Sequence, residues 1–364
     1  MSLKTTVVID LAALRHNFMV AAKAAPNSKL MAVIKANAYG HGVLEVADAL
    51  SVADGFAVAR LEEAIKLRNA GISKTILVLT GFSDERELLE FARYDLDAIV
   101  HSEYQVELVE ACTGIAPISV WLKINTGMNR LGIEPTEFAR LSDRIQLSAK
   151  VRLPYKLMTH FSCADDMDSH ITEQQVKLFD ESVAGHTGEQ SLANSAGLMG
   201  WQYAQRHWVR PGIMLYGGSP FNARKASDDQ LKPVMTFKSR IISLRKLSKG
   251  QCVGYGASWV APRACLIATI GAGYGDGYPR HAEVGTPILI NGLQAPLVGR
   301  VSMDSITVDA SQCVDIKVGD EVVLWGKGLP VDEVANMSET ISYDLMCGIT
   351  ERVNRIYWSE DDGK

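Results

Sequence analysis

The sequence has no excess of positive charge: 37 Lys and Arg residues are outnumbered by 42 Asp and Glu residues, for a formal net charge of −5. Chains that bind nucleic acid need a basic patch to neutralise phosphates, so nucleic acid is excluded as a partner. Uncharged apolar runs long enough to cross a membrane are also missing. Residues 1–17 lack the charged segment, apolar core and cleavage site of a secretory signal. We expect a soluble, cytoplasmic protein without a membrane partner.

Cysteine is scarce, and the spacing of the cysteines matches neither a disulfide pattern nor a metal-binding motif. The six cysteines include no C-x-x-C pair and no accompanying histidine cluster, which zinc sites would require. They also lack the density of disulfide-stabilised secreted domains. The sequence therefore predicts reduced thiols and no metal site. The cysteines are at positions 112, 163, 252, 265, 313 and 347.

Short apolar runs alternate with amphipathic helical patterns up to residue 217, and these runs predict eight strands. Strands that read as continuous apolar runs are typical of parallel sheets buried on both faces. The predicted strands cover residues 29–37, 55–60, 75–81, 96–102, 118–125, 155–162, 191–197 and 207–217.

Polar residues gather at the C-terminal ends of these predicted strands. A closed barrel brings such ends together in one mouth, where active sites form, whereas a doubly wound open sheet spreads them along a line. We therefore favour an α/β fold with an N-terminal (β/α)8 TIM barrel over the open sheet. The strand-end residues are Lys35, Arg60, Thr80, His101, Lys123, Asn125, His160, Asn194 and Arg210.

Beyond residue 228 the pattern changes to short alternating strands with glycine turns, which predicts a C-terminal, mainly β domain. The polar segment 220–230 marks the boundary. We expect a barrel over residues 11–228 and a β-rich domain over residues 229–364, with the strand at 1–10 packing on the second domain. The pattern at 331–358 predicts a helical ending.

Lys35 ends the first predicted strand, in the segment VIKANAYGHG. A charged amine is costly there unless it is paired, neutral or covalently engaged, although a lysine can also reach solvent along its stem. The turns after the last two strands, ANSAG and RPGIMLYG, offer backbone N–H groups suited to phosphate. A lysine beside a phosphate site suggests pyridoxal 5′-phosphate (PLP), which bonds to a lysine amine. Ser195, Gly212 and Ile213 are the phosphate candidates.

Nine motifs, in order between about residue 5 and residue 357, resemble those of the alanine racemases, which are bacterial PLP enzymes. Each motif is weak alone, but nine in register are highly specific. The resemblance implies a PLP-binding barrel, a C-terminal β domain, alanine as substrate, and a homodimer whose active sites use residues of both subunits. The motifs are VIKANAYGHG, LKINTGMNRLG, THFSCAD, NSAG, RPGIMLYG, VGYGASW, GAGYGDGYPR, VGRVSMDSITVD and ISYDL.

The resemblance also implies roles for individual residues. Lys35 would hold PLP and act as one base, and Tyr255 of the partner subunit would be the second. Racemisation removes a proton from one face of Cα and returns one to the other, so two bases are wanted. A buried structural role is the alternative for Tyr39 and for His160. The residues implied to bind the cofactor are Lys35, Tyr39, His160, Asn194, Ser195, Arg210, Gly212, Ile213 and Tyr343.

Substrate binding is implied for Arg130, whose guanidinium matches a carboxylate, helped by the backbone N–H of Met303 from the partner. A solvated surface charge is the alternative for Arg130. Lys123 corresponds to a lysine that many family members carbamylate, and Asn125 stands where the family often has Asp. The residues implied to support the site or gate its entrance are Lys123, Tyr274, Asp304, Arg280, Arg300 and Asp165.

Two other functions are compatible with a PLP barrel. One is a broader amino-acid racemase or a decarboxylase of basic amino acids; Tyr255, Tyr274 and Arg210 argue against the decarboxylase. The other is a non-catalytic, single-barrel PLP-binding protein, against which the large second domain argues. We expect an enzyme that interconverts L- and D-alanine by a two-base mechanism, supplying D-alanine for peptidoglycan or degrading it.

Overall fold

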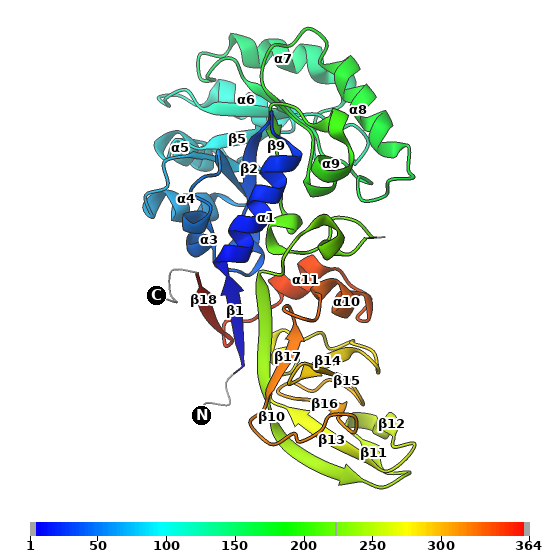
Figure 1. Ribbon diagram of the computed structural model, residues 1–364. Coiled ribbons are helices and arrows are strands. Elements are labelled where there is room, and N and C mark those ends of the chain that lie inside the picture. Colours follow the sequence, from blue (N-terminus) through cyan, green and yellow to red (C-terminus); the bar gives the residue numbers. More distant parts are fainter. Residues whose placement is uncertain (1–4, 223, 360–364) are drawn as a thin grey trace.

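The computed structural model describes residues 5–222 and 224–359, and this part of the chain forms two lobes (Figure 1). The upper lobe is a closed barrel of eight parallel strands with helices around it, and the lower lobe is mostly β. One continuous hydrophobic core extends through both lobes. No helix among the described residues is both long and apolar enough to span a membrane.

Closure of the barrel confirms the predicted fold class and excludes the open sheet. Each strand pairs in parallel with the next, and β2 pairs with β9 through Lys29↔Trp208 and Leu30↔Val209. A closed barrel gathers the C-terminal ends of its strands in one mouth. The strands are β2 (Lys29–Val33), β3 (Gly55–Val58), β4 (Thr75–Val78), β5 (Asp97–Val100), β6 (Ser119–Lys123), β7 (Lys156–Met158), β8 (Gln190–Ser191) and β9 (Trp208–Val209).

Amphipathic helices cover the outside of the barrel. The first begins at Asp10, whose side chain accepts a hydrogen bond from the N–H of Ala13, and it buries Leu14 and Phe18 on one face. The barrel helices are α1 (Leu11–Ala24), α3 (Val43–Ala49), α4 (Leu61–Asn69), α5 (Glu85–Arg93), α6 (Glu103–Ala111), α7 (Phe138–Leu147), α8 (Ile171–Ser182) and α9 (Ser195–Gly200), with 3₁₀ turns η1 (Pro135–Glu137), η2 (Gln202–Ala204), η3 (Ile213–Tyr216) and η4 (Ala226–Asp229). The short element α2 (Lys35–Tyr39), between β2 and α3, is a left-handed turn.

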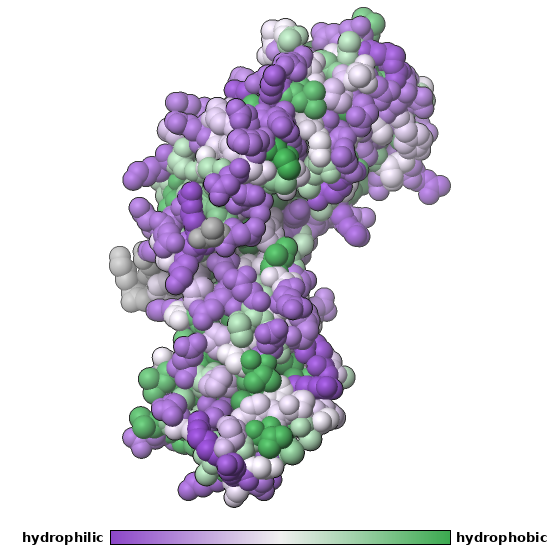
Figure 2. All heavy atoms as spheres, turned by 90° about the vertical axis from the view of Figure 1, so that its right-hand side faces the viewer, coloured by the Kyte–Doolittle hydropathy of each residue, from purple (hydrophilic) through white to green (hydrophobic). Residues whose placement is uncertain are grey.

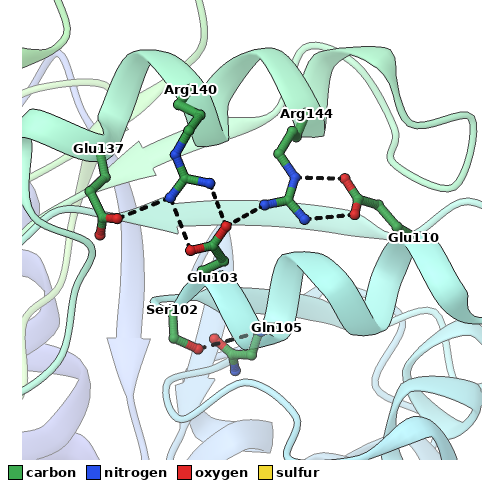
Figure 3. Close-up of polar contacts among 7 residues, drawn as sticks. All are labelled: Ser102, Glu103, Gln105, Glu110, Glu137, Arg140 and Arg144. Atoms are coloured by element: carbon green, nitrogen blue, oxygen red, sulfur yellow. Dashed lines mark hydrogen bonds and ion pairs between the residues drawn. The ribbon is translucent and has the colours of Figure 1, made fainter.

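Two of these outer helices are joined by ion pairs (Figure 3). Glu103 of α6 accepts hydrogen bonds from Arg140 and Arg144 of α7, and Arg144 also binds Glu110 through two bonds of 2.9 and 2.7 Å. Glu137 adds a third carboxylate, 3.0 Å from Arg140. This network fixes α7 against α6 on the outer surface.

All eight predicted strands exist, but each is shorter than predicted. The prediction for 29–37 was wrong beyond Val33, and the one for 191–197 was wrong beyond Ser191, because Asn194 caps α9 by accepting from the N–H of Gly197. The prediction for 207–217 was wrong beyond Val209, where a loop leads into η3. At the mouth the backbone leaves the sheet, so polar residues at the strand ends belong to loops and helix caps.

The lower lobe is an eight-stranded sheet in the order β15-β14-β17-β10-β1-β18, with β13 pairing with β10 and β16, as counted over the described residues. The long strand β10 (Met235–Leu247) pairs antiparallel with β1 (Thr6–Asp10). The other elements are β11 (Cys252–Val253), η5 (Tyr255–Ala257), β12 (Trp259–Val260), β13 (Cys265–Ile270), η6 (Tyr274–Asp276), β14 (Pro287–Ile290), β15 (Leu293–Pro296), β16 (Ile306–Asp309), β17 (Glu321–Trp325), α10 (Val331–Asn336), α11 (Ser342–Cys347) and β18 (Asn354–Trp358).

The predicted helical ending was wrong in its last part. Helices α10 and α11 lie between the lobes (Figure 1), but Asn354–Trp358 is a strand that pairs in parallel with β1. Its side chains alternate between exposed and partly buried, as in a strand with one solvated face. Residues 1–4 of the expected first strand and 360–364 of the expected second domain lie outside the described residues.

Candidate active site

Lys35 follows β2 at the barrel mouth and begins a left-handed turn. The φ angles of residues 36–39 lie between +51° and +54°, a conformation that costs L-residues about 1–2 kcal/mol each. The turn ends at Gly40, with φ of +81°, where a Cβ would lie 2.2 Å from the carbonyl oxygen of Met346. The turn therefore packs tightly against α11 and leads the chain from Lys35 to the buried Tyr39.

Two cations, Lys123 at the end of β6 and Arg130 on the loop after it, interact electrostatically with Lys35. Burial, and then the charge of Arg130, lowers the pKa of Lys35 below its ordinary value. Burial, together with the charges of Arg210, Arg130 and Lys35, lowers the pKa of Lys123 to about 8. Lys123 is only 7% exposed, whereas Arg130 lies exposed on the loop after β6. A mouth lined by several cations is suited to a ligand with carboxylate or phosphate groups.

Arg210 is 3% exposed and is held by four hydrogen bonds. Its terminal nitrogens donate to Ser191 Oγ at 2.6 Å, to the carbonyl oxygens of Thr159 at 2.8 Å and Leu192 at 3.2 Å, and to Nδ1 of His160 at 3.2 Å. Burial lowers the pKa of Arg210 to about 10, which leaves it charged at neutral pH. Burial and then the charge of Arg210 hold the pKa of His160 well below its usual range, so His160 is neutral and accepts from Arg210.

A small cradle forms where the loops after β8 and β9 meet. Ser195 Oγ accepts a 2.8 Å hydrogen bond from the N–H of Gly212, and a Cβ on Gly212 would lie 2.8 Å from the hydroxyl of Tyr39. The first N–H groups of α9 and of η3, which begins at the buried Ile213, have no acceptor within their own helices. Such groups bind phosphate, and with Lys35 nearby the chemistry of this donor set fits PLP.

Stacked aromatic rings support one wall of the cradle. The ring of Tyr39 stacks on Tyr216 at 4.6 Å, and Tyr216 in turn contacts His41 at 4.6 Å. Tyr343 of α11 adds a tilted ring 5.7 Å from Tyr39. Burial raises the pKa of Tyr39 and, to about 12, that of Tyr343. Both hydroxyls are therefore protonated donors at neutral pH.

The remaining expected residues of the mouth have structural contacts of their own. The Asn194 side chain caps α9, and Asp165 accepts a 2.8 Å hydrogen bond from Asn222. Asn125 donates to Asn129 and Glu134, both at 2.9 Å, and so organises the turn that leads to Arg130.

A second group of expected residues lies on the lower lobe. Tyr255 is 68% exposed and lies between β11 and β12, two strands at the end of the lower lobe away from the barrel (Figure 1). Met303 is 53% exposed, and its carbonyl oxygen accepts the N–H of Gly275 at 2.8 Å, which places it beside Tyr274. Among the described residues, no hydrogen bond, ion pair or ring contact joins Tyr255 or Met303 to Lys35. Figure 2 shows hydrophobic patches on this lobe within a mostly hydrophilic surface.

The other residues of this second group lie beside these two. The guanidinium of Arg300 would lie 3.5 Å from a Cβ on Gly256, so it is next to Tyr255. Asp304 accepts from Arg352 at 2.8 Å, and Arg280 is exposed.

Two residues next to the site, Arg352 and Glu63, were not identified from the sequence. Arg352 donates to Asp276 and Asp304, both at 2.8 Å, and so ties the turn of Tyr274 to that of Met303. Glu63 binds backbone N–H groups next to Lys35. Neither residue lies in one of the nine motifs. Each contacts a loop that is distant in sequence, so the sequence around it does not indicate its role.

Comparison with known proteins agrees with this geometry. Residues 9–220 match the alanine racemase N-terminal domain, and residues 234–357 match the alanine racemase C-terminal domain. The chain is 47% identical to the alanine racemase of Vibrio parahaemolyticus over 349 residues, covering 96% of this chain and 98% of that protein. It is likewise 47% identical to that of Aeromonas hydrophila over 345 residues, covering 95% and 97%.

Solved structures give the same result. The biosynthetic alanine racemase of Pseudomonas aeruginosa matches with a TM-score of 0.96 and 43% identity, covering 98% of this chain and 100% of that one. The alanine racemase of Acinetobacter baumannii matches with a TM-score of 0.91 and 36% identity, covering 98% and 100%. These matches confirm the resemblance found in the motifs. The chain belongs to the alanine racemase family.

Proposed function

We propose that this protein interconverts L- and D-alanine by a two-base mechanism with PLP as cofactor. The observation that supports this most directly is the mouth itself, where Lys35, the cradle at Gly212 and the buried Arg210 come together. Family membership favours the racemase over the decarboxylase and over a non-catalytic PLP-binding protein. The proposal includes two domains, a barrel over residues 11–228 and a β-rich domain over residues 229–364. It also includes the packing of the expected strand at residues 1–10 on the β-rich domain.

The cofactor, when bound, withdraws electrons from Cα and so makes its proton acidic. The Lys35 amine holds PLP and then accepts or returns a proton on one face of Cα; burial and Arg130 favour its neutral, basic form. Ser195, Tyr39, Tyr343 and the backbone of Gly212 and Ile213 would surround the phosphate, with the N–H of Gly212 fixing the Ser195 hydroxyl, and Asn194 holds α9 in place. Arg210 keeps its protons, so at the ring nitrogen of the cofactor, where the family resemblance places it, it would act only as a donor, while neutral His160 orients Arg210.

The second base is Tyr255 of the partner subunit. Its exposure on the lower lobe, away from the Lys35 of its own chain, supports a homodimer with shared sites. Met303 lies on the same lobe and supplies its backbone N–H to the substrate carboxylate bound by Arg130. Lys123, once carbamylated by CO2 as in many family members, would carry the negative charge that positions Arg130, because the unmodified amine repels that guanidinium. Tyr274, Arg280, Arg300, Asp304 and Asp165 form the entrance.

The biological direction of the reaction follows from concentrations. L- and D-alanine have equal free energies, so the enzyme supplies D-alanine for peptidoglycan when L-alanine is in excess and degrades it otherwise. One similar structure, that of the Pseudomonas aeruginosa alanine racemase, belongs to a biosynthetic enzyme, which favours supply. We place the reaction in the cytoplasm.

Exchange of the Cα proton with solvent deuterium, measured separately from each enantiomer, tests the proposal. Lys35→Ala should lose the absorbance at about 420 nm of lysine-bound PLP and all exchange. Tyr255→Phe should retain the absorbance but lose exchange from one enantiomer, because only one face of Cα then has a base. Normal exchange from both enantiomers by Tyr255→Phe would contradict the two-base assignment.

A further inference from the structure

Glu63 of α4 binds two neighbouring loops of the barrel mouth. Its Oε1 accepts hydrogen bonds from the N–H groups of Ala36 at 2.6 Å and Asn37 at 3.4 Å. Its Oε2 accepts from the N–H groups of Ala59 at 2.9 Å and Arg60 at 3.1 Å. A carboxylate with acceptor bonds on both oxygens is fixed in orientation, and such charge-assisted bonds are strong. Glu63 thus connects the loop after β3 to the start of the left-handed turn after Lys35.

The left-handed turn needs such support because its backbone is strained at four consecutive non-glycine residues. Its far end is held by His41, whose ring Nδ1 lies 2.8 Å from the carbonyl oxygen of Tyr39. Arg355 adds a 2.9 Å hydrogen bond to the carbonyl oxygen of Gly40. At the near end, beside Lys35, the side-chain acceptor for the N–H of Ala36 among the described residues is Glu63.

We propose that Glu63 is a positioning residue of the racemase reaction, whose carboxylate holds the turn after Lys35 so that the lysine amine meets both the cofactor and Cα. This inference rests on the proposed function. The negative charge of Glu63 also raises the pKa of Lys35, which opposes the effect of Arg130. Glu63 touches backbone N–H groups rather than the reacting atoms, so it acts through the position of Lys35.

Three variants separate this role from general stability. Glu63→Gln keeps the size of the side chain but places an NH2 group opposite backbone N–H donors. Glu63→Asp keeps the negative charge, but its side chain is one methylene shorter, so the carboxylate lies farther from those N–H groups. Glu62→Gln is the matched control, because Glu62 is an exposed acid in the same first turn of α4. Each is measured by hydrogen–deuterium exchange of segment 34–42, with and without PLP, and by kcat and KM for both alanine enantiomers.

For Glu63→Gln and Glu63→Asp we expect exchange of segment 34–42 to rise about tenfold, with and without PLP. We expect kcat to fall about tenfold to a hundredfold while KM changes little, because a displaced base slows proton transfer and leaves carboxylate binding intact. Glu62→Gln should match the wild type. Unchanged exchange in both Glu63 variants, or raised exchange with an unchanged kcat, would overturn the proposal. Absence of racemase activity in the wild type would instead count against the proposed function, while the exchange result still tests the contact.

Discussion

At the scale of single residues, Lys123 shows how burial sets the chemistry of the mouth. It lies at the end of β6, its side-chain amine has no hydrogen bond or ion pair among the described residues, and the charges of Arg210, Arg130 and Lys35 act on it. Because its pKa falls to about 8 from an ordinary 10.5, the folded chain binds this proton less tightly than the unfolded chain does. Protonated Lys123 therefore destabilises the fold below pH 8, and this cost disappears as pH rises toward 10.5.

Replacement of Lys123 by Met should remove that cost. In CO2-free buffer without PLP, we expect the free energy of unfolding at pH 7 to rise by up to about 3 kcal/mol. The gain should shrink as pH increases above 8, as followed by denaturant unfolding at several pH values. Lys66→Met on the exposed side of α4 is the control and should show no such pH dependence. A gain that is constant with pH would show that packing, and not charge, is responsible.

Site residues that stand in motifs could be predicted from the sequence, whereas those that act through contacts with the backbone of other loops could not. Lys35 and Arg210 stand in recognisable segments at strand ends, so their place at the mouth could be predicted. Glu63 and Arg352 look like ordinary charges of amphipathic segments. Their importance depends on which loops the fold places beside them, and a single sequence does not carry that information.

At the scale of elements, the alternation of apolar runs predicted every barrel strand, but not where each ends. The turn after β2 illustrates the reason: residues 36–38, Ala-Asn-Ala, carry no glycine, yet the structure holds them in a left-handed conformation. Contacts from α4, α11 and β18 impose that conformation, and local propensity opposes it. The strand at Asn354–Trp358 was missed for a similar reason, since its partner β1 lies more than 300 residues earlier in the sequence.

The ion-pair network between α6 and α7 allows a prediction at this scale (Figure 3). The hydrogen bond and charge of Arg140, with those of Arg144, lower the pKa of Glu103 to about 2. A lowered pKa means that the stabilisation is present above pH 4.5 and is lost as pH falls toward 2. Glu103→Gln should therefore lower Tm slightly at pH 7 and low salt, with a difference that vanishes at high salt or low pH. Glu107→Gln, at an exposed position of the same helix, should leave Tm unchanged; an equal loss in both variants would exclude a specific network effect.

At the scale of the whole molecule, the two groups of site residues lie on different lobes. Lys35 follows β2 at the barrel mouth, whereas Tyr255 is 68% exposed between β11 and β12, which lie at the far end of the lower lobe (Figure 1). Two-fold symmetry would bring the lower lobe of one subunit to the mouth of the other, and a symmetric dimer makes two such sites at once. The sequence suggested this sharing only through the family resemblance, because no pattern in one chain shows which of its residues face a second copy.

Mixing two inactive variants tests that arrangement. If each site combines Lys35 of one subunit with Tyr255 of the other, a hybrid of Lys35→Ala and Tyr255→Phe chains has one site with both bases and one with neither. Equal mixing with free subunit exchange makes half of the dimers hybrids, so about a quarter of the wild-type racemase activity should return. If each site used both bases of its own chain, no hybrid would contain an intact site and no activity would return. Differently tagged chains, with hybrid formation verified by native mass spectrometry, distinguish a failure of exchange from a failure of complementation, and only the second would contradict the shared site.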